Sequence, residues 1–482
     1  MQTKLDYSEE ERPAGKLALF SACCDEVGRF CSALRKPLVV HHYDADGLSS
    51  GAVVVGALKK LGREPVALMQ KQLVEESLEH IRNAAKKLDC DGVVFVDFGS
   101  GYYSLIEKIL GEEKIAVIDH HEPEKATRRK GFAEANPHFF GVDGGSEASA
   151  STTAFLCFKQ YAFNELAELA IVGAVGDMQD AGGLKGANLE VAREAERNGY
   201  CETTKDLRLF GRVSRPLANF LAFCDEPFIP GLAGNERAAA KFLLDNGIPL
   251  YREEGGKRVW LHYYDLSLEQ RRKLASAVIN HCLAHGVSKE IVAEMIGEVY
   301  SLPRRPRNTE LYDAYEFATL LNACGRHGHP EQGIAVCLGE ESAYEKAREL
   351  LALHRALIRK GIALARKKAV DFGVFYFVDG RKEISDLVIG TVANALRASA
   401  LFPEDKPFIA LSLSEEGKLK FSARASKALV EKGLNLNKVM SEAAKGLGVG
   451  GGHAAAAGAN IEPGSEGEFL KRCAKAIEAQ IA

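Results

Sequence analysis

The chain has 482 residues, 46% of them hydrophobic and 27% charged, a composition that is typical of folded globular proteins and argues against extensive disorder. Its 62 lysines and arginines and 66 aspartates and glutamates give a formal net charge of −4, so whole-chain charge does not favour nucleic-acid binding and a basic binding surface would be local. The eleven cysteines include no CxxC pair, which argues against a disulfide framework or a zinc ribbon.

The sequence predicts a cytoplasmic protein without a membrane partner. It contains no run of about 18 consecutive apolar residues, the length that a membrane-spanning helix needs. The polar and acidic N-terminal stretch, residues 1–16, lacks the basic-then-apolar order of a secretory signal.

The first 200 residues alternate short apolar runs with segments of helical periodicity, beginning with a helix expected over residues 16–35. We interpret the apolar runs as buried strands, at residues 38–40, 93–96, 115–118 and 170–176. This alternation is typical of a mostly parallel sheet with helices on both faces. The fold class is therefore α/β, and residues 1–200 are predicted to form the first domain.

Residues 201–340 have a different texture, with expected helices at 268–285 and 313–324 and several prolines between them. We predict a helix-rich insertion or extension here. Ser342 and Glu345 fit a capping box that opens a long helix ending near Lys368, so residues 341–369 are expected to connect two domains.

The last part of the chain is predicted to be a smaller α/β domain over residues 370–482. A helix is expected near 385–398, and strands are expected at 370–379, 408–413 and 418–422.

Acidic and histidine residues follow each of the four apolar runs of the first domain. They are His42, Asp44 and Asp46; Asp97; Asp119, His120 and His121; and Asp177. A single aspartate at a strand end is more often a turn or helix-capping residue. Because the carboxyl ends of parallel strands share one edge of the sheet, four such coincidences favour one common site.

Close carboxylates resist joint ionisation, so a cluster of this kind requires neutralising cations. Carboxylate oxygens with imidazole nitrogens, and without thiolates, suit Mn²⁺ or Mg²⁺. Two such ions about 3.5–4 Å apart activate a water molecule and stabilise the leaving oxygen of a phosphodiester.

The chain resembles the DHH phosphoesterases in the order of its motifs, Asp44-Ala45-Asp46-Gly47, Asp97, Asp119-His120-His121 and Gly176-Asp177. Gly450-Gly451-Gly452-His453 resembles the glycine-rich signature of the DHH-associated domain. Residues 206–236 and 312–326 further resemble archaeal RecJ-like proteins, including the GINS-associated nuclease. The resemblance covers nearly the whole chain.

This resemblance implies a set of site residues. Five would be ligands of two Mn²⁺ or Mg²⁺ ions, with His42 as a weaker candidate: Asp44, Asp46, Asp97, His120 and Asp177. Asp119 would either ligate an ion or orient His120, and His121 would face the scissile phosphate as a catalytic group. A substrate phosphate would be bound by Arg424, Gly450, Gly451, Gly452 and His453.

By resemblance, the expected function is an exonuclease that degrades single-stranded DNA or RNA to mononucleotides in replication or repair, with GINS as an expected partner. One alternative is a replisome scaffold without turnover. Another is a phosphodiesterase for short oligonucleotides or cyclic dinucleotides. The unbroken acidic motifs favour catalysis, and the long segment at 201–340 favours a long substrate or a protein partner.

Three other patterns carry less weight. Gly446, Gly448 and Gly451 fit GxGxxG but follow a helical stretch, so no nucleotide cofactor is expected. His281 and His285 lack the glutamate of a metalloprotease helix. Three basic clusters are candidates for contacts with a nucleic-acid backbone, although each is more often a solvated or packed face: residues 128–130, 304–307 and 366–368, the last extended by Arg355, Arg359 and Lys360.

Overall fold

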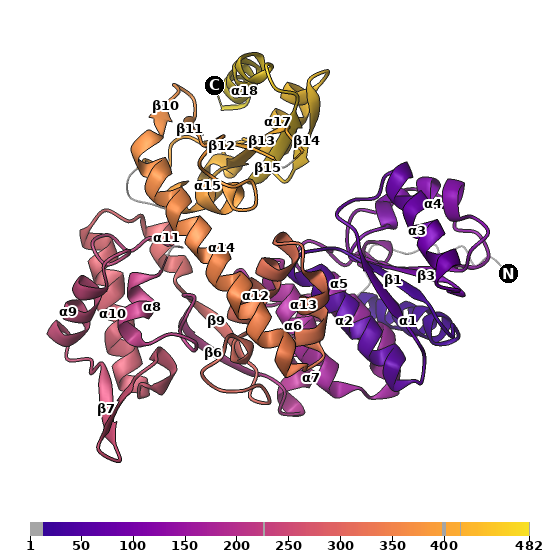
Figure 1. Ribbon diagram of the computed structural model, residues 1–482, viewed down its shortest axis with the longest axis horizontal. Coiled ribbons are helices and arrows are strands. Elements are labelled where there is room, and N and C mark those ends of the chain that lie inside the picture. The colour runs from indigo at the N-terminus through magenta and orange to yellow at the C-terminus, as the bar shows by residue number, and fades with distance from the viewer. Residues whose placement is uncertain (1–12, 225–226, 398–401, 415, 482) are drawn as a thin grey trace. The chain divides into compact units, whose positions relative to one another are not determined.

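The structure is a computed structural model that describes residues 13–224, 227–397, 402–414 and 416–481 (Figure 1). Most of the polar N-terminal stretch considered above lies outside the described residues. The chain forms two compact units, residues 1–206 with 297–351, and residues 207–296 with 352–482. The first boundary lies close to the expected one, whereas residues 297–340, assigned from the sequence to the helix-rich segment, belong with the N-terminal unit.

A parallel sheet forms the centre of the first unit and confirms the predicted α/β class. Its order is β2-β1-β3-β4-β5. The three inner strands are wholly buried, which explains their continuous apolar sequences. The two edge strands are partly exposed and gave no comparable signal. The strands are β1 (Leu38–His41), β2 (Val66–Met69), β3 (Val93–Val96), β4 (Ile115–Ile118) and β5 (Phe132–Ala135).

Helices cover both faces of this sheet (Figure 1). On one face, α3 (Glu75–Lys87) and α4 (Tyr103–Leu110) pack in a core that includes Phe95. On the other face, α1 (Pro13–Ser32) and α2 (Ala45–Lys60) contact the strands. The order of the strands reverses between β1 and β3, and such a switch point opens a crevice at the carboxyl edge where ligands bind.

Further helices pack around the buried α2, except α7, which packs on α5 and α6. One prediction is wrong, because residues 170–176 are not a strand but form all of α6 after its first turn, and Asp177 is the C-cap of this helix. Periodicity cannot separate a fully buried helix from a buried strand in an apolar run of this length. The helices are α5 (Ala150–Phe158), α6 (Ala167–Gly176), α7 (Gly186–Arg197), α12 (Ala314–Arg326) and α13 (Pro330–Cys337). β6 (Glu202–Leu207) follows α7 in the chain, β9 (Ile296–Ser301) precedes α12, and the two strands pair in a two-stranded sheet.

The part of the second unit before residue 297 is helix-rich, as expected. Its core includes the wholly buried Phe220 and Tyr263. The hairpin of β7 (Tyr251–Glu254) and β8 (Lys257–Trp260) carries Trp260, which is 55% exposed and contacts Tyr251 edge to face. The helices are α8 (Leu217–Ala222), α9 (Glu236–Asp245), α10 (Leu268–Ala284) and α11 (Lys289–Glu294).

The long helix α14 (Glu341–Lys368) ends where predicted but begins one residue before Ser342. Ser342 is therefore not its N-cap, and the predicted capping box is wrong. The remaining short 3-10 helices are η1 (Ser100–Tyr102), η2 (Pro137–Phe140), η3 (Lys159–Tyr161), η4 (Asn164–Leu166), η5 (Tyr263–Asp265) and η6 (Glu310–Tyr312).

The C-terminal α/β part contains a six-stranded sheet in the order β10-β11-β12-β13-β15-β14. One face packs against α17 and α18 and the other against α14 and α15. Its strands are β10 (Val370–Asp371), β11 (Tyr376–Asp379), β12 (Phe408–Leu413), β13 (Leu419–Arg424), β14 (Gly448–Gly452) and β15 (Ala456–Ile461). Its helices are α15 (Ile389–Arg397), α16 (Lys427–Glu431), α17 (Leu436–Ala444) and α18 (Glu466–Ile481).

Among the described residues, no helix combines the length and the apolar character needed to cross a membrane.

The packing of the first sheet predicts the effect of a core truncation. Phe95 is wholly buried on β3, so Phe95→Ala is expected to lower the free energy of unfolding by about 3–5 kcal/mol. Chemical denaturation followed by circular dichroism measures this change. Phe139→Ala is the matched control, because Phe139 is 46% exposed; equal losses in the two variants would contradict the buried position of β3.

Candidate metal centre

The acidic and histidine side chains singled out from the sequence gather at the carboxyl ends of β1, β3 and β4 and at the C-terminal end of α6. Their ligand atoms form three overlapping groups, in each of which the atoms lie within 4.8 Å of one another. The groups are His42, Asp44 and Asp97; Asp46, His120 and Asp177; and Asp97, Asp119, His120 and His121.

The first group is built on the loop between β1 and α2. Asp44 is the N-cap of α2, and its Oδ1 accepts a hydrogen bond from Gly47 N at 3.0 Å. The Nδ1 atom of His42 lies 2.9 Å from Asp44 Oδ2 and 3.4 Å from Asp97 Oδ2. Burial disfavours the charged imidazole, but the two carboxylates outweigh it and raise the pKa of His42 to about 12. The same interaction, against the effect of burial, holds the pKa of Asp44 well below its usual range.

Asp97 belongs to two of the three groups and is held in an unusual backbone conformation. Its φ is 67°, in the left-handed region that costs a residue with a Cβ about 1 kcal/mol or more. The Oδ1 atom of its buried carboxylate lies 3.2 Å from the Nε2 atom of His120. Strain of this kind is typical of residues whose position serves a site.

The second group depends on the N-terminus of α5. Asp46 accepts hydrogen bonds from Ala150 N at 2.7 Å and Ser151 N at 3.0 Å, one on each carboxylate oxygen. Burial, together with the neighbouring Asp97 and Asp177, raises the pKa of Asp46 to about 7. Its carboxylate is therefore fixed in place by the helix but is poorly compensated in charge.

The ring of His120 is oriented by the backbone. Its Nδ1 lies 2.7 Å from Gly144 O, and donation to this carbonyl keeps a proton on Nδ1, so that Nε2 is the nitrogen that a cation would bind in exchange for its proton. Nε2 faces Asp97 Oδ1 at 3.2 Å and Asp46 Oδ2 at 3.8 Å. Although burial opposes it, the surrounding carboxylates raise the pKa of His120 well above its ordinary value.

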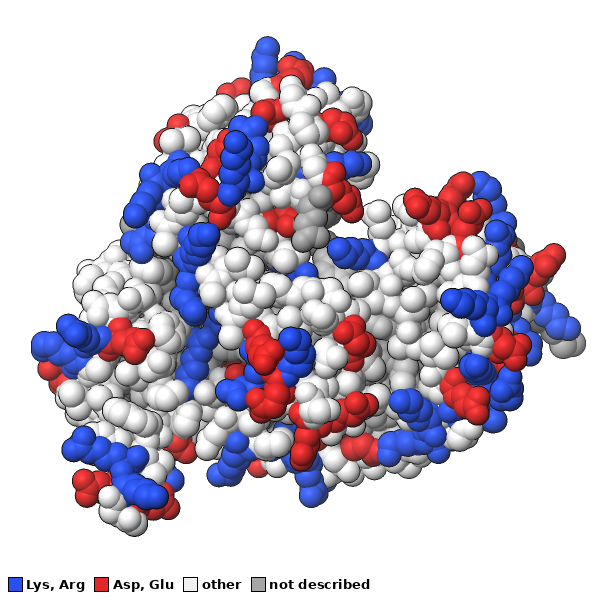
Figure 2. Space-filling view, in the orientation of Figure 1, with Lys and Arg blue, Asp and Glu red and all other residues white. Residues whose placement is uncertain are grey.

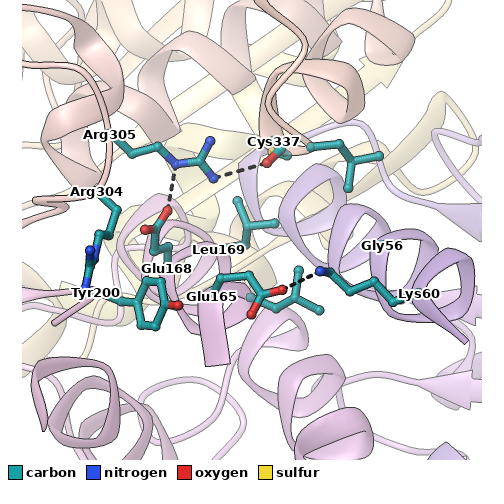
Figure 3. Close-up of a pocket in the computed structure, with 11 residues that line it drawn as sticks. Gly56, Lys60, Glu165, Glu168, Leu169, Tyr200, Arg304, Arg305 and Cys337 are labelled. Carbon is teal, nitrogen blue, oxygen red and sulfur yellow. Dashed lines mark hydrogen bonds and ion pairs between the residues drawn. The ribbon is translucent and has the colours of Figure 1, made fainter. Parts of the chain in front are cut away.

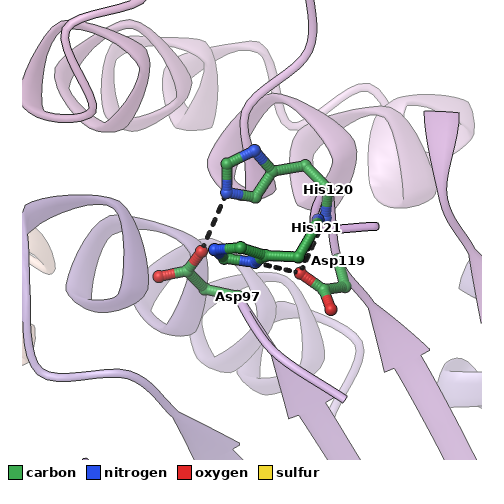
Figure 4. A group of neighbouring side chains, drawn as sticks. All are labelled: Asp97, Asp119, His120 and His121. Carbon is green, nitrogen blue, oxygen red and sulfur yellow. Dashed lines mark hydrogen bonds and ion pairs between the residues drawn. The ribbon is translucent and has the colours of Figure 1, made fainter. Parts of the chain in front are cut away.

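Asp119 organises the third group (Figure 4). It is wholly buried and accepts hydrogen bonds from Ser100 N at 2.9 Å and His120 N at 2.7 Å. Its Oδ1 also lies 2.8 Å from His121 Nδ1. Of the two expected roles this arrangement favours orientation over ligation, but the ring that Asp119 orients is that of His121 rather than His120.

The donor set fits divalent cations. The carboxylates raise the pKa of both His42 and His120 far above 6.5, which shows that this site favours positive charge. Each of the two smaller groups offers carboxylate oxygens and one imidazole nitrogen, the ligands that suit Mn²⁺ or Mg²⁺. Cysteine is absent from all three groups found among the described residues.

Two polar residues beside these ligands were missed in the sequence. Gln179 and Asn188 are almost wholly buried, and Gln179 donates a hydrogen bond to Asp177 Oδ2 at 2.8 Å. Amide side chains have no charge or spacing signature of their own. The only available signal was that Gln179 lies two residues after an expected ligand.

The expected phosphate-binding residues lie in the second unit, near one end of its six-stranded sheet. Arg424 is the last residue of β13 and pairs in register with Ala456, whose carbonyl accepts a hydrogen bond from His453 N at 2.8 Å. Gly450, Gly451 and Gly452 lie on the edge strand β14 rather than in a loop. A Cβ on Gly450 would clash with Met440 O, so this glycine also permits close packing of α17 on the sheet.

The basic clusters take part in intramolecular contacts. In the first cluster Arg128 pairs with Glu134, and Arg129 Nε lies 2.7 Å from Glu107. The guanidinium groups of α14 lie over aromatic rings of the same unit: Arg355 over Phe210, Arg359 over Phe223 and Arg366 over Phe228. On the face in view in Figure 2, basic and acidic side chains are interspersed, apart from one column of basic side chains left of the centre.

The second cluster, residues 304–307, contributes Arg304 and Arg305 to the lining of a pocket of about 480 Å³ (Figure 3). Arg305 forms an ion pair with Glu168, Nε to Oε2, at 2.6 Å, and Arg304 lies over the ring of Tyr200. Lys60, at the C-terminal end of α2, pairs with Glu165 across the pocket at 2.6 Å. The cations of this pocket are thus largely balanced by its carboxylates.

The fold and the acidic centre define a metal-dependent hydrolase. Three family models match the chain: the DHH family, N-terminal domain, over residues 36–174; the DHH-CID domain over residues 209–296; and the DHHA1 domain over residues 372–479. An uncharacterized protein of Methanocaldococcus jannaschii is 31% identical over 450 residues, which are 92% of this chain and 93% of that protein. The chain belongs to the DHH superfamily and is RecJ-like.

Solved structures share the fold. RecJ of Thermus thermophilus in complex with Mn²⁺ matches with a TM-score of 0.57 and 18% identity, over 96% of this chain and 55% of that chain. The chain thus spans about half the length of that RecJ. CDC45 of Entamoeba histolytica matches with a TM-score of 0.60 and 12% identity, over 97% of this chain and 99% of that chain. At these identities the likeness concerns the fold alone.

The packing around Asp46 predicts a sensitive glycine. A Cβ on Gly173 would clash with Asp46 Oδ1 and Ser151 Oγ, so Gly173→Ala is expected to displace the Asp46 carboxylate and to cost about 1–3 kcal/mol of stability. Mn²⁺ affinity, measured by isothermal titration calorimetry, should fall in parallel. Gly15→Ala on α1, where a Cβ meets nothing within 4 Å, is the control; unchanged Mn²⁺ binding in Gly173→Ala would contradict this role for Asp46.

Proposed function

We propose that the protein is an exonuclease that uses two divalent cations, Mn²⁺ or Mg²⁺, to hydrolyse single-stranded DNA or RNA from one end to mononucleotides. The observation that carries the proposal is the pair of ligand groups at the switch point of the parallel sheet. The DHH and DHHA1 matches and the RecJ-like fold support it.

In this proposal each smaller group holds one cation. His42, Asp44 and Asp97 would hold one ion, and Asp46, His120 and Asp177 would hold the other. The two groups adjoin where Asp97 Oδ1 lies 3.2 Å from His120 Nε2. When bound, the cations supply an activated water and stabilise charge on the leaving oxygen. The protein keeps the ligands in place through backbone N–H groups at the N-termini of α2 and α5.

His121 is the proposed acid at the scissile bond. Burial favours its neutral form, but the hydrogen bond and charge of Asp119 prevail and raise the pKa of His121 to about 9. The imidazole is therefore protonated at neutral pH, and its side chain is 54% exposed while Nδ1 is held by Asp119. The opposite ring nitrogen is thus available to donate to a phosphate oxygen or to the leaving group.

The C-terminal domain supplies the proposed phosphate contacts. Arg424 and His453 flank the first residue of β15 at one end of the sheet. β14 is the edge strand, and alternate peptide groups of an edge strand point away from the sheet and are open to a ligand. The small glycine residues allow an anion to approach this backbone closely.

A second candidate is a replisome scaffold without turnover, and the likeness in fold to CDC45 is compatible with it. The complete set of acidic residues favours catalysis instead, because a scaffold has no need of so many crowded carboxylates. We also propose a role at the replication fork with GINS as the partner, because residues 206–236 and 312–326 resemble archaeal RecJ-like proteins that include the GINS-associated nuclease.

Digestion of end-labelled oligonucleotides tests the proposed activity. Wild-type protein with Mn²⁺ should release mononucleotides from single-stranded DNA or RNA but not from a blunt duplex, and the label released first gives the polarity. Asp97→Asn keeps the shape of the side chain and removes its charge, so cleavage is expected to fall to the level without metal.

Asp89→Asn is the matched control for this substitution. Asp89 also has a positive φ, 53°, but its side chain is 93% exposed, and asparagine tolerates this conformation in both variants. Full activity is expected in the control. Wild-type protein that binds Mn²⁺ yet cleaves no strand would contradict the nuclease and favour the scaffold, for which a GINS pull-down is the next test.

A further inference from the structure

We propose that Gln179 is a positioning residue that holds Asp177 and His120 in place for one of the two cations, and that Asn188 acts through it. This inference rests on the proposed two-cation centre and goes beyond its ligands. It assigns a role to two buried amides that contact the centre and that the proposed chemistry does not otherwise use.

The backbone after α6 directs Gln179 towards the site. Met178 N donates to Val175 O at 3.1 Å and Gln179 N donates to Ala174 O at 3.0 Å, the two bonds of a Schellman motif. The left-handed position of this motif usually takes glycine, but here it is Met178, with a φ of 57° and 77% exposure. The turn therefore points Met178 outwards and places Gln179, 3% exposed, inside.

The amide nitrogen of Gln179 connects two expected ligands. It donates to Asp177 Oδ2 at 2.8 Å and to Gly144 O at 2.9 Å. Gly144 O is also the acceptor that orients the ring of His120 through Nδ1 at 2.7 Å. One amide group thus fixes the rotation of the Asp177 carboxylate and the carbonyl that sets the tautomer of His120.

Asn188 on α7 holds the side-chain amide of Gln179 in place. Its Nδ2 donates to Gln179 Oε1 at 2.7 Å, and its Oδ1 accepts from Ser149 N at 3.1 Å. Ser149 is the N-cap of α5, the helix whose first N–H groups hold Asp46. The network therefore reaches Asp46, His120 and Asp177, the three members of one ligand group.

The hydrogen bonds of Gln179 and Asn188 lead to one of the two smaller ligand groups. Among the described residues, no hydrogen bond joins Gln179 or Asn188 to His42 or Asp44, the members of the other small group. Partners that orient metal ligands typically change metal affinity by about 10–100-fold when they are removed. Loss of the Gln179 amide should therefore weaken one cation much more than the other.

Mn²⁺ titration of the 482-residue chain tests this, with binding measured by calorimetry and by the electron paramagnetic resonance signal of free Mn²⁺. Wild-type protein should bind two ions. Gln179→Met, which keeps the length of the side chain without its donors, should weaken one ion by roughly 10–100-fold. Gln160→Met is the matched control on the exposed η3 helix of the same unit, and should bind both ions as wild type does.

Asn188→Asp separates positioning from packing. It keeps the acceptor for Ser149 N but loses the donor to Gln179, so it should weaken the same ion, and by less. The double variant should be no weaker than Gln179→Met alone, because both changes act through one contact. Metal-free thermal unfolding of each variant reports the structural contribution separately.

The outcomes distinguish this inference from the function on which it rests. If Gln179→Met binds two ions with wild-type affinities, or if its affinities for both ions fall equally, the positioning role is overturned. The two-cation centre is left intact by either result. Wild-type protein that binds no Mn²⁺ would instead overturn the proposed function. If Gln179→Met unfolds in the absence of metal, the result with Asn188→Asp tests the inference, because this substitution changes no group that touches a ligand.

Discussion

Crowded negative charge at the carboxyl edge of the parallel sheet is the constraint around which the N-terminal unit is built. Asp44, Asp46, Asp97 and Asp177 lie within one small region with histidines between them, and like charges at such distances strongly disfavour joint ionisation. Burial and this repulsion raise the pKa of Asp46 and Asp177, and the same crowding of carboxylates raises the pKa of His42 and His120. Divalent cations resolve it without protonation.

The fold lessens the conflict before any cation binds. Backbone N–H groups at the starts of α2 and α5 and after β3 point at Asp44, Asp46 and Asp119, and helix N-termini favour negative charge. The same carboxylates therefore cap helices and face the site. Because of this double use, a substitution at these positions is expected to change stability and chemistry together.

Much of the site followed from the sequence because buried parallel strands give continuous apolar runs that end in polar residues. Residues 38–40, 93–96 and 115–118 were found in this way. The apolar run before Asp177 correctly predicted that this aspartate lies beside the other acidic residues, but the run is a helix and not a strand. A fully buried helix has no polar face to reveal its period. The edge strands β2 and β5 are only partly buried and lack a comparable pattern.

Other features depend on contacts that no local pattern encodes. Residues 297–351 return to the first unit through the pairing of β9 with β6, which only the folded chain shows. Gln179 and Asn188 matter through partners far away in sequence, such as Gly144 and Ser149. The basic clusters looked like binding stripes, yet their partners are carboxylates and aromatic rings of the protein itself.

Trp260 on the β7–β8 hairpin is an intrinsic fluorescent probe. It is the single tryptophan of the chain, and it is half exposed in the unit that does not contain the acidic centre. Indole fluorescence therefore reports on the helix-rich segment. A partner that covers this hairpin would take the indole out of water and shift its emission to the blue.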